Sequence, residues 1–279
     1  MPILVSTHLF SNRRLHTALF DRMLHAGAEG FEIFCARQSF DYTNRGEMES
    51  LAAWFRQNPG RLHSLHAPMY SDDCWGRSGE PPLNLANPDH RQAVRSLEET
   101  ERALAFAELA PFRYLVLHLG IGGEPDSEAR SEAACAQLSR LRVKAKALGV
   151  HLLVENIPNG LSTPARLLQF LRQNRLDDVG ICFDAGHAHL PIENYGGGSA
   201  LESFEMVAAR TLSTHLHDNH GERDEHLWPG EGTLPFDQLL PRMAQARGLP
   251  WLLELRDTPE SETTFERLRQ AIAQLRARL

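Results

Sequence analysis

The chain has 279 residues, 42% of them hydrophobic and 23% charged, a composition that excludes a disordered or fibrous protein. A net charge of −7 and a pI of about 6.1 argue against a protein that binds nucleic acid through a broad basic face. No apolar run approaches the ~20 residues of a membrane helix, and the start lacks the pattern of a secretory signal. We therefore expect no membrane span and a cytoplasmic location. The four cysteines form no C-x-x-C pair, which is typical of reduced thiols.

Short apolar runs alternate with longer amphipathic stretches, a pattern typical of repeated βα units. Strands are expected at residues 3–8, 31–35, 61–66, 114–118, 151–155, 180–184, 212–217 and 251–254. Helices are expected to follow them at residues 13–26, 47–57, 89–109, 127–148, 164–174, 200–210, 236–247 and 260–279. A long loop rich in Pro, Gly and Asp separates the third strand from its helix and runs through Pro88.

Eight βα units without a long linker predict one (β/α)8 TIM barrel domain over residues 1–279. The alternative is an open, doubly wound sheet. That fold usually carries a glycine-rich phosphate turn after its first strand, whereas residues 7–12 contain no glycine. The sequence therefore favours the barrel.

The ends of the predicted strands share a chemical property: each carries a side chain of a type that binds metals. Reactive groups in a barrel come from these ends, which line one open face. Taken alone, each residue is more simply interpreted as a surface carboxylate or as a core histidine with its hydrogen bonds made. Several charges near one point, however, need a counter-charge, and a divalent cation supplies it. The residues are His8, Glu32, His66, His118, Glu155, Asp184, His215 and Glu254.

More donors follow the seventh strand. The loop after it carries Asp224 and His226, whose spacing puts both side chains on the same side of an extended segment. His215 and His217 have the same spacing, which would make His217 a further donor; the favoured alternatives are that it supports a ligand from behind or faces solvent. His220 is expected to lie on the surface.

Together these segments resemble the xylose-isomerase-like TIM barrels, a family that includes sugar-phosphate isomerases, epimerases and the endonuclease IV type of AP endonuclease. The resemblance covers essentially the whole chain, and the combination and order of its motifs are specific. The matching segments are His66-Ala67-Pro68, Leu117-His118-Leu119-Gly120, Val154-Glu155-Asn156, Cys182-Phe183-Asp184-Ala185-Gly186-His187, His215-Leu216-His217-Asp218, Asp224-Glu225-His226 through Gly230-Glu231-Gly232, and Leu253-Glu254.

The resemblance implies two ligand sets. In isomerases and epimerases, Glu155, Asp184, His215 and Glu254 would hold one divalent ion, commonly manganese, and the two glutamates would act as acid and base. In the endonucleases, nine equivalent positions build a three-zinc cluster. All nine are present: His66, His118, Glu155, Asp184, His187, His215, Asp224, His226 and Glu254.

Two departures from the endonuclease pattern favour carbohydrate chemistry. Gly186 replaces the small thiol or methyl residue usual before His187 in the endonucleases. The loop from His66 to Leu85 is also longer than the compact loop of the endonucleases. We expect a metal-dependent sugar or sugar phosphate isomerase or epimerase that transfers a proton next to a carbonyl through a metal-stabilised enediolate. The alternatives are an endonuclease IV-like zinc phosphodiesterase acting on DNA and a barrel that binds a sugar or metal without turnover.

The expected catalytic residues are Glu155, Glu254 and His187, and the expected substrate contacts are His66, Arg256 and Trp228. Arg256 could instead pair with Asp257, and Trp228, like Trp75, could cap the core rather than cover a sugar ring. The expected cofactor is one to three Mn or Zn ions and the expected partner a small carbohydrate; nucleic acid is not expected. A homodimer is expected from the resemblance only.

Overall fold

In the computed structural model the first seven strands pair in parallel in chain order, and the eighth strand pairs with the first. The structure describes residues 1–191, 199–246, 248–256 and 263–278. The strands are β1 (Ile3–Ser6), β2 (Gly30–Phe34), β3 (Leu62–His66), β4 (Tyr114–Leu117), β5 (His151–Glu155), β6 (Gly180–Asp184), β7 (Thr211–His215) and β8 (Trp251–Leu253).

Closure of the ring depends on one residue beyond the end of β7. The N–H of Leu216 donates to the carbonyl oxygen of Leu252 at 2.8 Å, and the N–H of Glu254 donates to the carbonyl oxygen of Leu216 at 3.1 Å. These two bonds join β7 to β8 and complete the TIM barrel, as predicted. They also hold Glu254 next to the end of β7.

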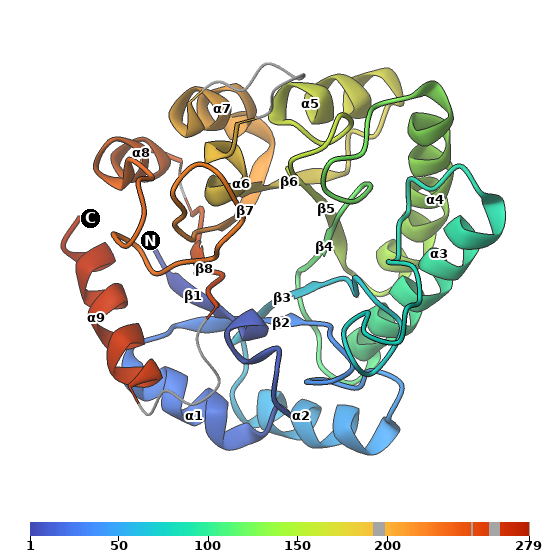
Figure 1. Ribbon diagram of the computed structural model, residues 1–279. Coiled ribbons are helices and arrows are strands. Elements are labelled where there is room, and N and C mark those ends of the chain that lie inside the picture. Colours follow the sequence, from blue (N-terminus) through green and yellow to red (C-terminus); the bar gives the residue numbers. More distant parts are fainter. Residues whose placement is uncertain (192–198, 247, 257–262, 279) are drawn as a thin grey trace.

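Helices surround the ring of strands in Figure 1. The α-helices are α1 (Thr17–Ala26), α2 (Arg45–Gln57), α3 (His90–Leu104), α4 (Glu128–Ala147), α5 (Pro164–Gln173), α6 (Ala185–His189), α7 (Ala200–Val207), α8 (Phe236–Met243) and α9 (Thr264–Arg276). The 3-10 helices are η1 (Thr7–Phe10), η2 (Ala105–Glu108) and η3 (Ala208–Arg210).

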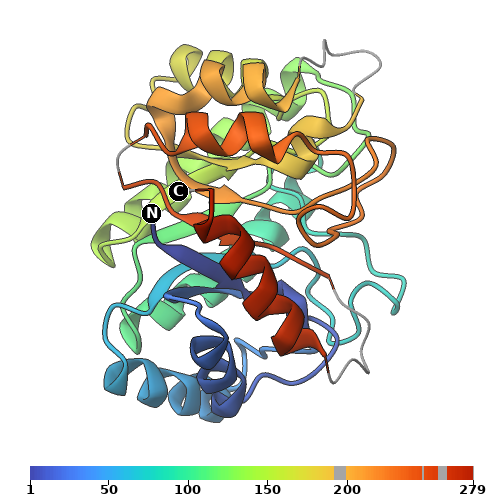
Figure 2. The same ribbon diagram turned by 90° about the vertical axis from the view of Figure 1, so that its left-hand side faces the viewer.

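Side-chain caps determine where several helices begin. Asn44 accepts from the N–H of Gly46 at the start of α2, and Asp89 accepts from the N–H of Arg91 at the start of α3. Thr163 caps α5, whose first residue is a proline. The loops that follow the strands gather at one end of the barrel (Figure 2).

The structure corrects several predicted boundaries. The first strand ends at Ser6 rather than residue 8, because the Ser6 hydroxyl accepts from the N–H of His8 and turns the chain into η1. The first helix begins at Thr17, not residue 13. The α-helical part of the third helix ends at Leu104, and η2 continues it to Glu108. The seventh strand ends at His215, two residues early.

Helix α6 was not predicted. It starts where β6 ends, because the Asp184 side chain accepts from the N–H of His187 at 2.6 Å. The predicted helix ends at residues 247, 260 and 279 lie outside the described residues.

Side-chain alternation along β4 to β6 separates two layers. Val116, Leu153 and Cys182 pack together inside the barrel, whereas their strand neighbours pack toward the helices in the larger core. The alternation that places Leu153 inside carries Glu155 to the same side at the mouth of the barrel. None of the helices in the described ranges has the length and apolar character needed to cross a membrane.

Candidate metal centre

Glu155 ends β5 and is fully buried. Its Oε2 lies 3.3 Å from Nε2 of His66 and 3.3 Å from Nε2 of His118. The two imidazole nitrogens are themselves 3.3 Å apart. These residues, from the ends of three neighbouring strands, form what we call the His66 group.

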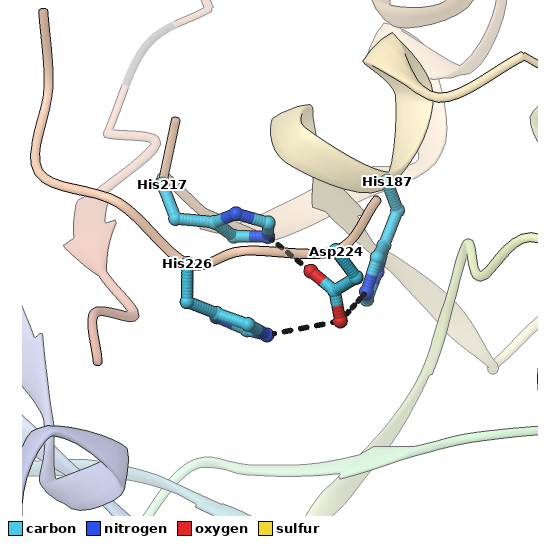
Figure 3. Close-up of side chains that lie close together, drawn as sticks. All are labelled: His187, His217, Asp224 and His226. Atoms are coloured by element: carbon cyan, nitrogen blue, oxygen red, sulfur yellow. Dashed lines mark hydrogen bonds and ion pairs between the residues drawn. The ribbon is translucent and has the colours of Figure 1, made fainter. Parts of the chain in front are cut away.

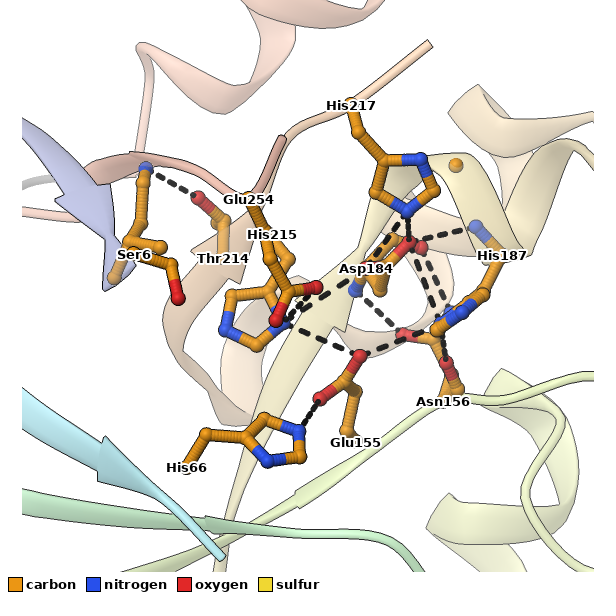
Figure 4. Close-up of polar contacts among 12 residues, drawn as sticks. Ser6, His66, Glu155, Asn156, Asp184, His187, Thr214, His215, His217 and Glu254 are labelled. Atoms are coloured by element: carbon orange, nitrogen blue, oxygen red, sulfur yellow. Dashed lines mark hydrogen bonds and ion pairs between the residues drawn. The ribbon is translucent and has the colours of Figure 1, made fainter. Parts of the chain in front are cut away.

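The other oxygen of Glu155 faces a second set of donors. Nδ1 of His215 lies 3.2 Å from Oε1 of Glu155, 3.5 Å from Oε2 of Glu254 and 3.8 Å from Oδ2 of Asp184. Figure 4 shows these side chains converging from β5, β6, β7 and the end of β8. Glu155, Asp184, His215 and Glu254 form the His215 group.

A third set lies around Asp224, in the loop after β7. Oδ2 of Asp224 is 3.2 Å from Nε2 of His226 and 3.4 Å from Nε2 of His187. Oδ1 of Asp224 is 3.9 Å from Nε2 of His217 (Figure 3). His187, His217, Asp224 and His226 form the His217 group, whose donor atoms all lie within 4.8 Å of one another.

The donor atoms fit bound divalent ions better than a network of hydrogen bonds. Both carboxylate oxygens of Glu155 and Nδ1 of His215 are buried without a hydrogen-bond partner. A tetrahedral ion with ligands at 2.0–2.1 Å has ligands about 3.4 Å apart, close to the 3.3 Å edges of the His66 group. Imidazole and carboxylate together suit zinc and manganese. Cys182 also lies beside Glu155 and His215, but burial raises the pKa of its thiol.

Backbone carbonyls orient three of these imidazoles. Nδ1 of His66 donates to the carbonyl oxygen of Ala67 at 2.8 Å, and Nδ1 of His226 donates to that of Glu254 at 2.9 Å. Because a carbonyl oxygen can only accept, the proton sits on Nδ1 and leaves the lone pair of Nε2 for a metal. Nδ1 of His187 likewise lies 3.0 Å from the carbonyl oxygen of Asn156.

Asn156 joins the ends of β5 and β6. Its amide nitrogen donates to the carbonyl oxygen of Asp184 at 2.8 Å, and its amide oxygen accepts from the N–H of Asp184 at 2.8 Å. The residue after Glu155 therefore sets the position of Asp184. Its place in the Val154-Glu155-Asn156 motif is the sequence signal that could have identified this function.

The loop after β7 is built around Asp218, which is fully buried. The Asp218 carboxylate accepts from the N–H groups of Gly230, Gly232 and Leu234 at 2.9 to 3.0 Å. These bonds fold residues 218–234 back toward the barrel mouth and bring Asp224 to the site. His226 has a φ of +51° in this loop, in the left-handed region.

Charge compensation dominates the electrostatics of the site. Burial by itself lowers the pKa of His187, but the carboxylates of Asp184 and Asp224 raise that pKa well above its usual value. Burial by itself raises the pKa of Glu155, but the charges of His215 and His118 hold that pKa well below its usual value. Positive charge is thus favoured at this point of the barrel, and metal ions would supply it in exchange for protons.

A groove with a cavity volume of about 680 Å³ opens beside the His217 group. His8 lies in its wall and packs its ring against that of His226, with centroids 4.5 Å apart. The groove is also lined by Trp75, Trp228 and three arginines, Arg77, Arg256 and Arg267. A small polar molecule in this groove could meet aromatic side chains and positive charge next to His8, which contacts the His217 group.

The structure places all nine predicted ligands in the three groups. Arg256 and Trp228 line the groove, whereas His66 is buried in the His66 group. Trp228 is 5% exposed, and the guanidinium of Arg267 lies 4.6 Å from its ring centroid. The alternative partner of Arg256, Asp257, lies outside the described residues.

The sequence left the roles of two residues undecided. His217 is fully buried within a donor cluster rather than facing solvent. Glu32 contacts His215 from the side opposite the His215 group, with its Oε1 3.1 Å from Nε2. The sequence signal for Glu32 was its place at the end of a strand. His220, expected at the surface, is exposed and contacts Glu225.

Comparisons with known proteins agree with this fold. Protein MJ1311 of Methanocaldococcus jannaschii is 30% identical over 173 residues, which span 58% of this chain and 57% of that protein. The chain thus spans just over half the length of this relative. The crystal structure of a D-tagatose 3-epimerase-like protein is similar with a TM-score of 0.77 and 22% identity, covering 100% of this chain and 97% of that one.

The TTHB071 protein of Thermus thermophilus, solved after soaking with ZnCl2, is similar with a TM-score of 0.71 and 22% identity, covering 99% of this chain and 96% of that one. A family model described as xylose isomerase-like TIM barrel matches residues 20–277. The chain therefore belongs to the xylose isomerase-like TIM barrel family.

Proposed function

We propose that the chain is a divalent-metal-dependent isomerase or epimerase that acts on a sugar or sugar phosphate. One observation carries the proposal: the carboxylates of Glu155 and Glu254 lie 3.2 and 3.5 Å from the same nitrogen of His215. Two carboxylates at one point can serve as a base and an acid on either side of a substrate carbon. The similarity to a D-tagatose 3-epimerase-like protein supports the same chemistry.

The His66 and His215 groups would hold the metal. A divalent ion bound there would supply positive charge next to the oxygen that becomes negative when a proton leaves the adjacent carbon. Glu155 and Glu254 would take the proton from one face of the substrate and return it to the other. His187, whose Nδ1 lies 3.3 Å from Oε1 of Glu155, would orient that carboxylate.

The groove would bind the remainder of the substrate. Arg256 is exposed in its wall and would contact hydroxyl or phosphate oxygens, since a guanidinium donates several hydrogen bonds. The ring of Trp75, which is half-buried in the same wall, would contact the carbon skeleton of the sugar, because Trp228 is 5% exposed and packs in the core. His66, which lines a separate pocket, would contact the substrate next to Glu155.

Solvent exchange tests this proposal. The metal-loaded protein is incubated in deuterated water with fructose, tagatose or psicose, and with their phosphates, and deuterium at the carbon next to the carbonyl is followed by NMR. We expect incorporation that disappears with Glu155→Gln and persists with Glu205→Gln, which removes an exposed carboxylate on α7 outside the groove. Absence of exchange with all these ketoses at full metal loading contradicts the proposal.

One observation favours a second candidate, a zinc phosphodiesterase: the His217 group supplies donors for a further ion beyond the two groups that share Glu155. Several zinc ions could generate hydroxide and neutralise a phosphate. Incubation with a duplex that contains an abasic site separates the candidates. Metal-dependent nicking lost with Glu155→Gln supports the phosphodiesterase, and an intact duplex supports the sugar enzyme.

A further inference from the structure

Gly186 and His217 are matched to each other in shape. A Cβ atom at position 186 would lie 2.0 Å from Cε1 and 2.3 Å from Nδ1 of the His217 ring. Real atoms do not approach so closely, so the imidazole occupies the space that any other residue at position 186 would need. The amide of Asn219 also donates to the carbonyl oxygen of Gly186 at 2.9 Å. The backbone at the start of α6 therefore packs directly against the segment after β7.

This packing aims the His217 ring at the His217 group. The ring is fully buried and stacks on that of His226, with centroids 4.0 Å apart and an interplanar angle of 22°. Figure 3 shows its Nε2 directed at Asp224, on the same side as the nitrogens of His187 and His226. Nε2 also lies 3.1 Å from Oδ1 of Asp184.

We propose that His217 is a fourth protein ligand in the His217 group, so that the group forms a closed structural zinc site. This inference rests on the metal dependence in the proposed function. Structural zinc sites have four protein ligands in a tetrahedron, whereas catalytic sites keep a position open for water or substrate. With His187, Asp224 and His226, His217 completes such a set, and reaction chemistry is confined to the two groups that share Glu155.

The types of donor residue favour zinc in the His217 group. The His217 group has three imidazoles and one carboxylate, a set that suits zinc, whereas the His215 group has three carboxylates and one imidazole, a set that also suits manganese. An ion held by His217 and His187 on one side and by Asp224 and His226 on the other would fasten the loop of residues 218–234 to the barrel. That loop carries Trp228 into the groove wall.

Zinc binding tests the role of His217. The metal-free full-length chain is titrated with zinc against a chromophoric chelator, for the wild type, His217→Asn, Gly186→Ala and His220→Asn. We expect both His217→Asn and Gly186→Ala to weaken one zinc equivalent by more than the roughly 10–100-fold cost of losing an outer-shell partner. The double variant should be no weaker than the single ones, because both changes remove the same ligand. His220→Asn, which changes an exposed histidine three residues away, should bind zinc as the wild type does.

Two readouts independent of activity complete the test. Cobalt at this site should give the intense visible absorption of a tetrahedral ion in the wild type, and weaker absorption in His217→Asn, where water enters the coordination sphere. Zinc should protect residues 218–234 from proteolysis in the wild type but not in the variant. Circular dichroism of the metal-free proteins shows whether both chains fold alike.

Several outcomes overturn the inference. Unchanged zinc affinities and cobalt spectrum in His217→Asn would mean that His217 only donates to Asp184. A wild-type chain that binds no divalent metal would overturn both this inference and the proposed function. Loss of one zinc equivalent in the variant, from a wild type that shows no ketose exchange, would support the inference and contradict the proposed function alone.

Discussion

Nε2 of His215 lies 3.1 Å from Oε1 of Glu32, on the edge of the ring opposite the nitrogen that faces Glu155 and Glu254. Both residues are fully buried. Burial by itself raises the pKa of Glu32, but the charge of His215 lowers it, so Glu32 is ionised and accepts a hydrogen bond from Nε2. The proton stays on Nε2, which donates a hydrogen bond to Oε2 of Glu32 at 3.3 Å, and this leaves the lone pair of Nδ1 for a metal.

Glu32 should strengthen metal binding by His215. Glu32→Gln should weaken metal binding at the His215 group by about 10–100-fold, because a neutral amide makes the imidazole a poorer ligand. Competition with a chelator measures the affinity. Glu29→Gln, which changes an exposed carboxylate just before β2, is the control and should bind metal as the wild type does. Equal affinities for all three proteins would show that Glu32 has no influence on the metal.

Glu155 and Glu254 differ in how many groups they join. Glu155 belongs to the His66 and His215 groups, and Glu254 to the His215 group. Glu155→Gln should therefore reduce metal content at two sites and Glu254→Gln at one, while each lowers kcat by at least about 100-fold through loss of an acid or base. Elemental analysis after dialysis and steady-state kinetics are the measurements. Identical metal contents in the two variants would contradict the bridging role of Glu155.

Asp218 organises the loop through its buried carboxylate. In Asp218→Asn an NH2 group replaces one of the oxygens that accept from Gly230, Gly232 and Leu234, so buried N–H groups lose partners. We expect the free energy of unfolding to fall by about 2–4 kcal/mol, measured by urea denaturation. Asp237→Asn, at an 84% exposed side chain, should leave it within about 0.5 kcal/mol. A loss below about 1 kcal/mol in Asp218→Asn would show that the loop does not depend on this carboxylate.

His63 gives a pH dependence outside the metal groups. Burial lowers its pKa to about 4, from 6.5 in an unfolded chain. The unfolded chain binds a proton at this histidine more readily than the folded chain does. The contribution of neutral His63 to the free energy of unfolding is therefore fully present above pH 6.5. It is lost as the pH falls toward 4, by up to about 3 kcal/mol.

Urea unfolding at about pH 7.5 and pH 4.5, with chelator present, tests this prediction. His63→Gln should show a smaller difference in unfolding free energy between the two pH values than the wild type. His90→Gln, at an exposed histidine at the start of α3, should retain the wild-type difference. A His63→Gln variant with the full wild-type difference would place the pH dependence elsewhere.

Arg256 should distinguish phosphorylated from free substrates. Arg256→Ala should raise KM for a sugar phosphate by about tenfold or more and for the free sugar by less, because a charged hydrogen bond is lost only with phosphate. Steady-state kinetics with matched pairs of substrates measure both values. Arg172→Ala, in the last turn of α5, is the control. Equal increases for both substrates would mean that Arg256 does not contact the phosphate.

The sequence by itself predicted the barrel and the donor side chains that gather at its mouth. An apolar run that ends in a carboxylate, such as Leu152 to Glu155, indicates both a strand and the residue at which it ends. The reason is that a charge directly after a buried strand must lie at the barrel mouth or be compensated. Parallel strands bring such ends together without further information. Asp184 and His215 were found for the same reason.

Only the tertiary structure decided where side chains point once the chain has left a strand. Alternation no longer fixes the direction of His217, which is set by packing against Gly186, far earlier in the sequence. Glu32 contacts Nε2 of His215, on the ring edge away from the His215 group, because the ends of β2 and β7 come together inside the barrel. No local sequence pattern contains this proximity. Local periodicity encodes the elements and the end at which their donors lie, whereas packing between distant segments determines which donors share a metal.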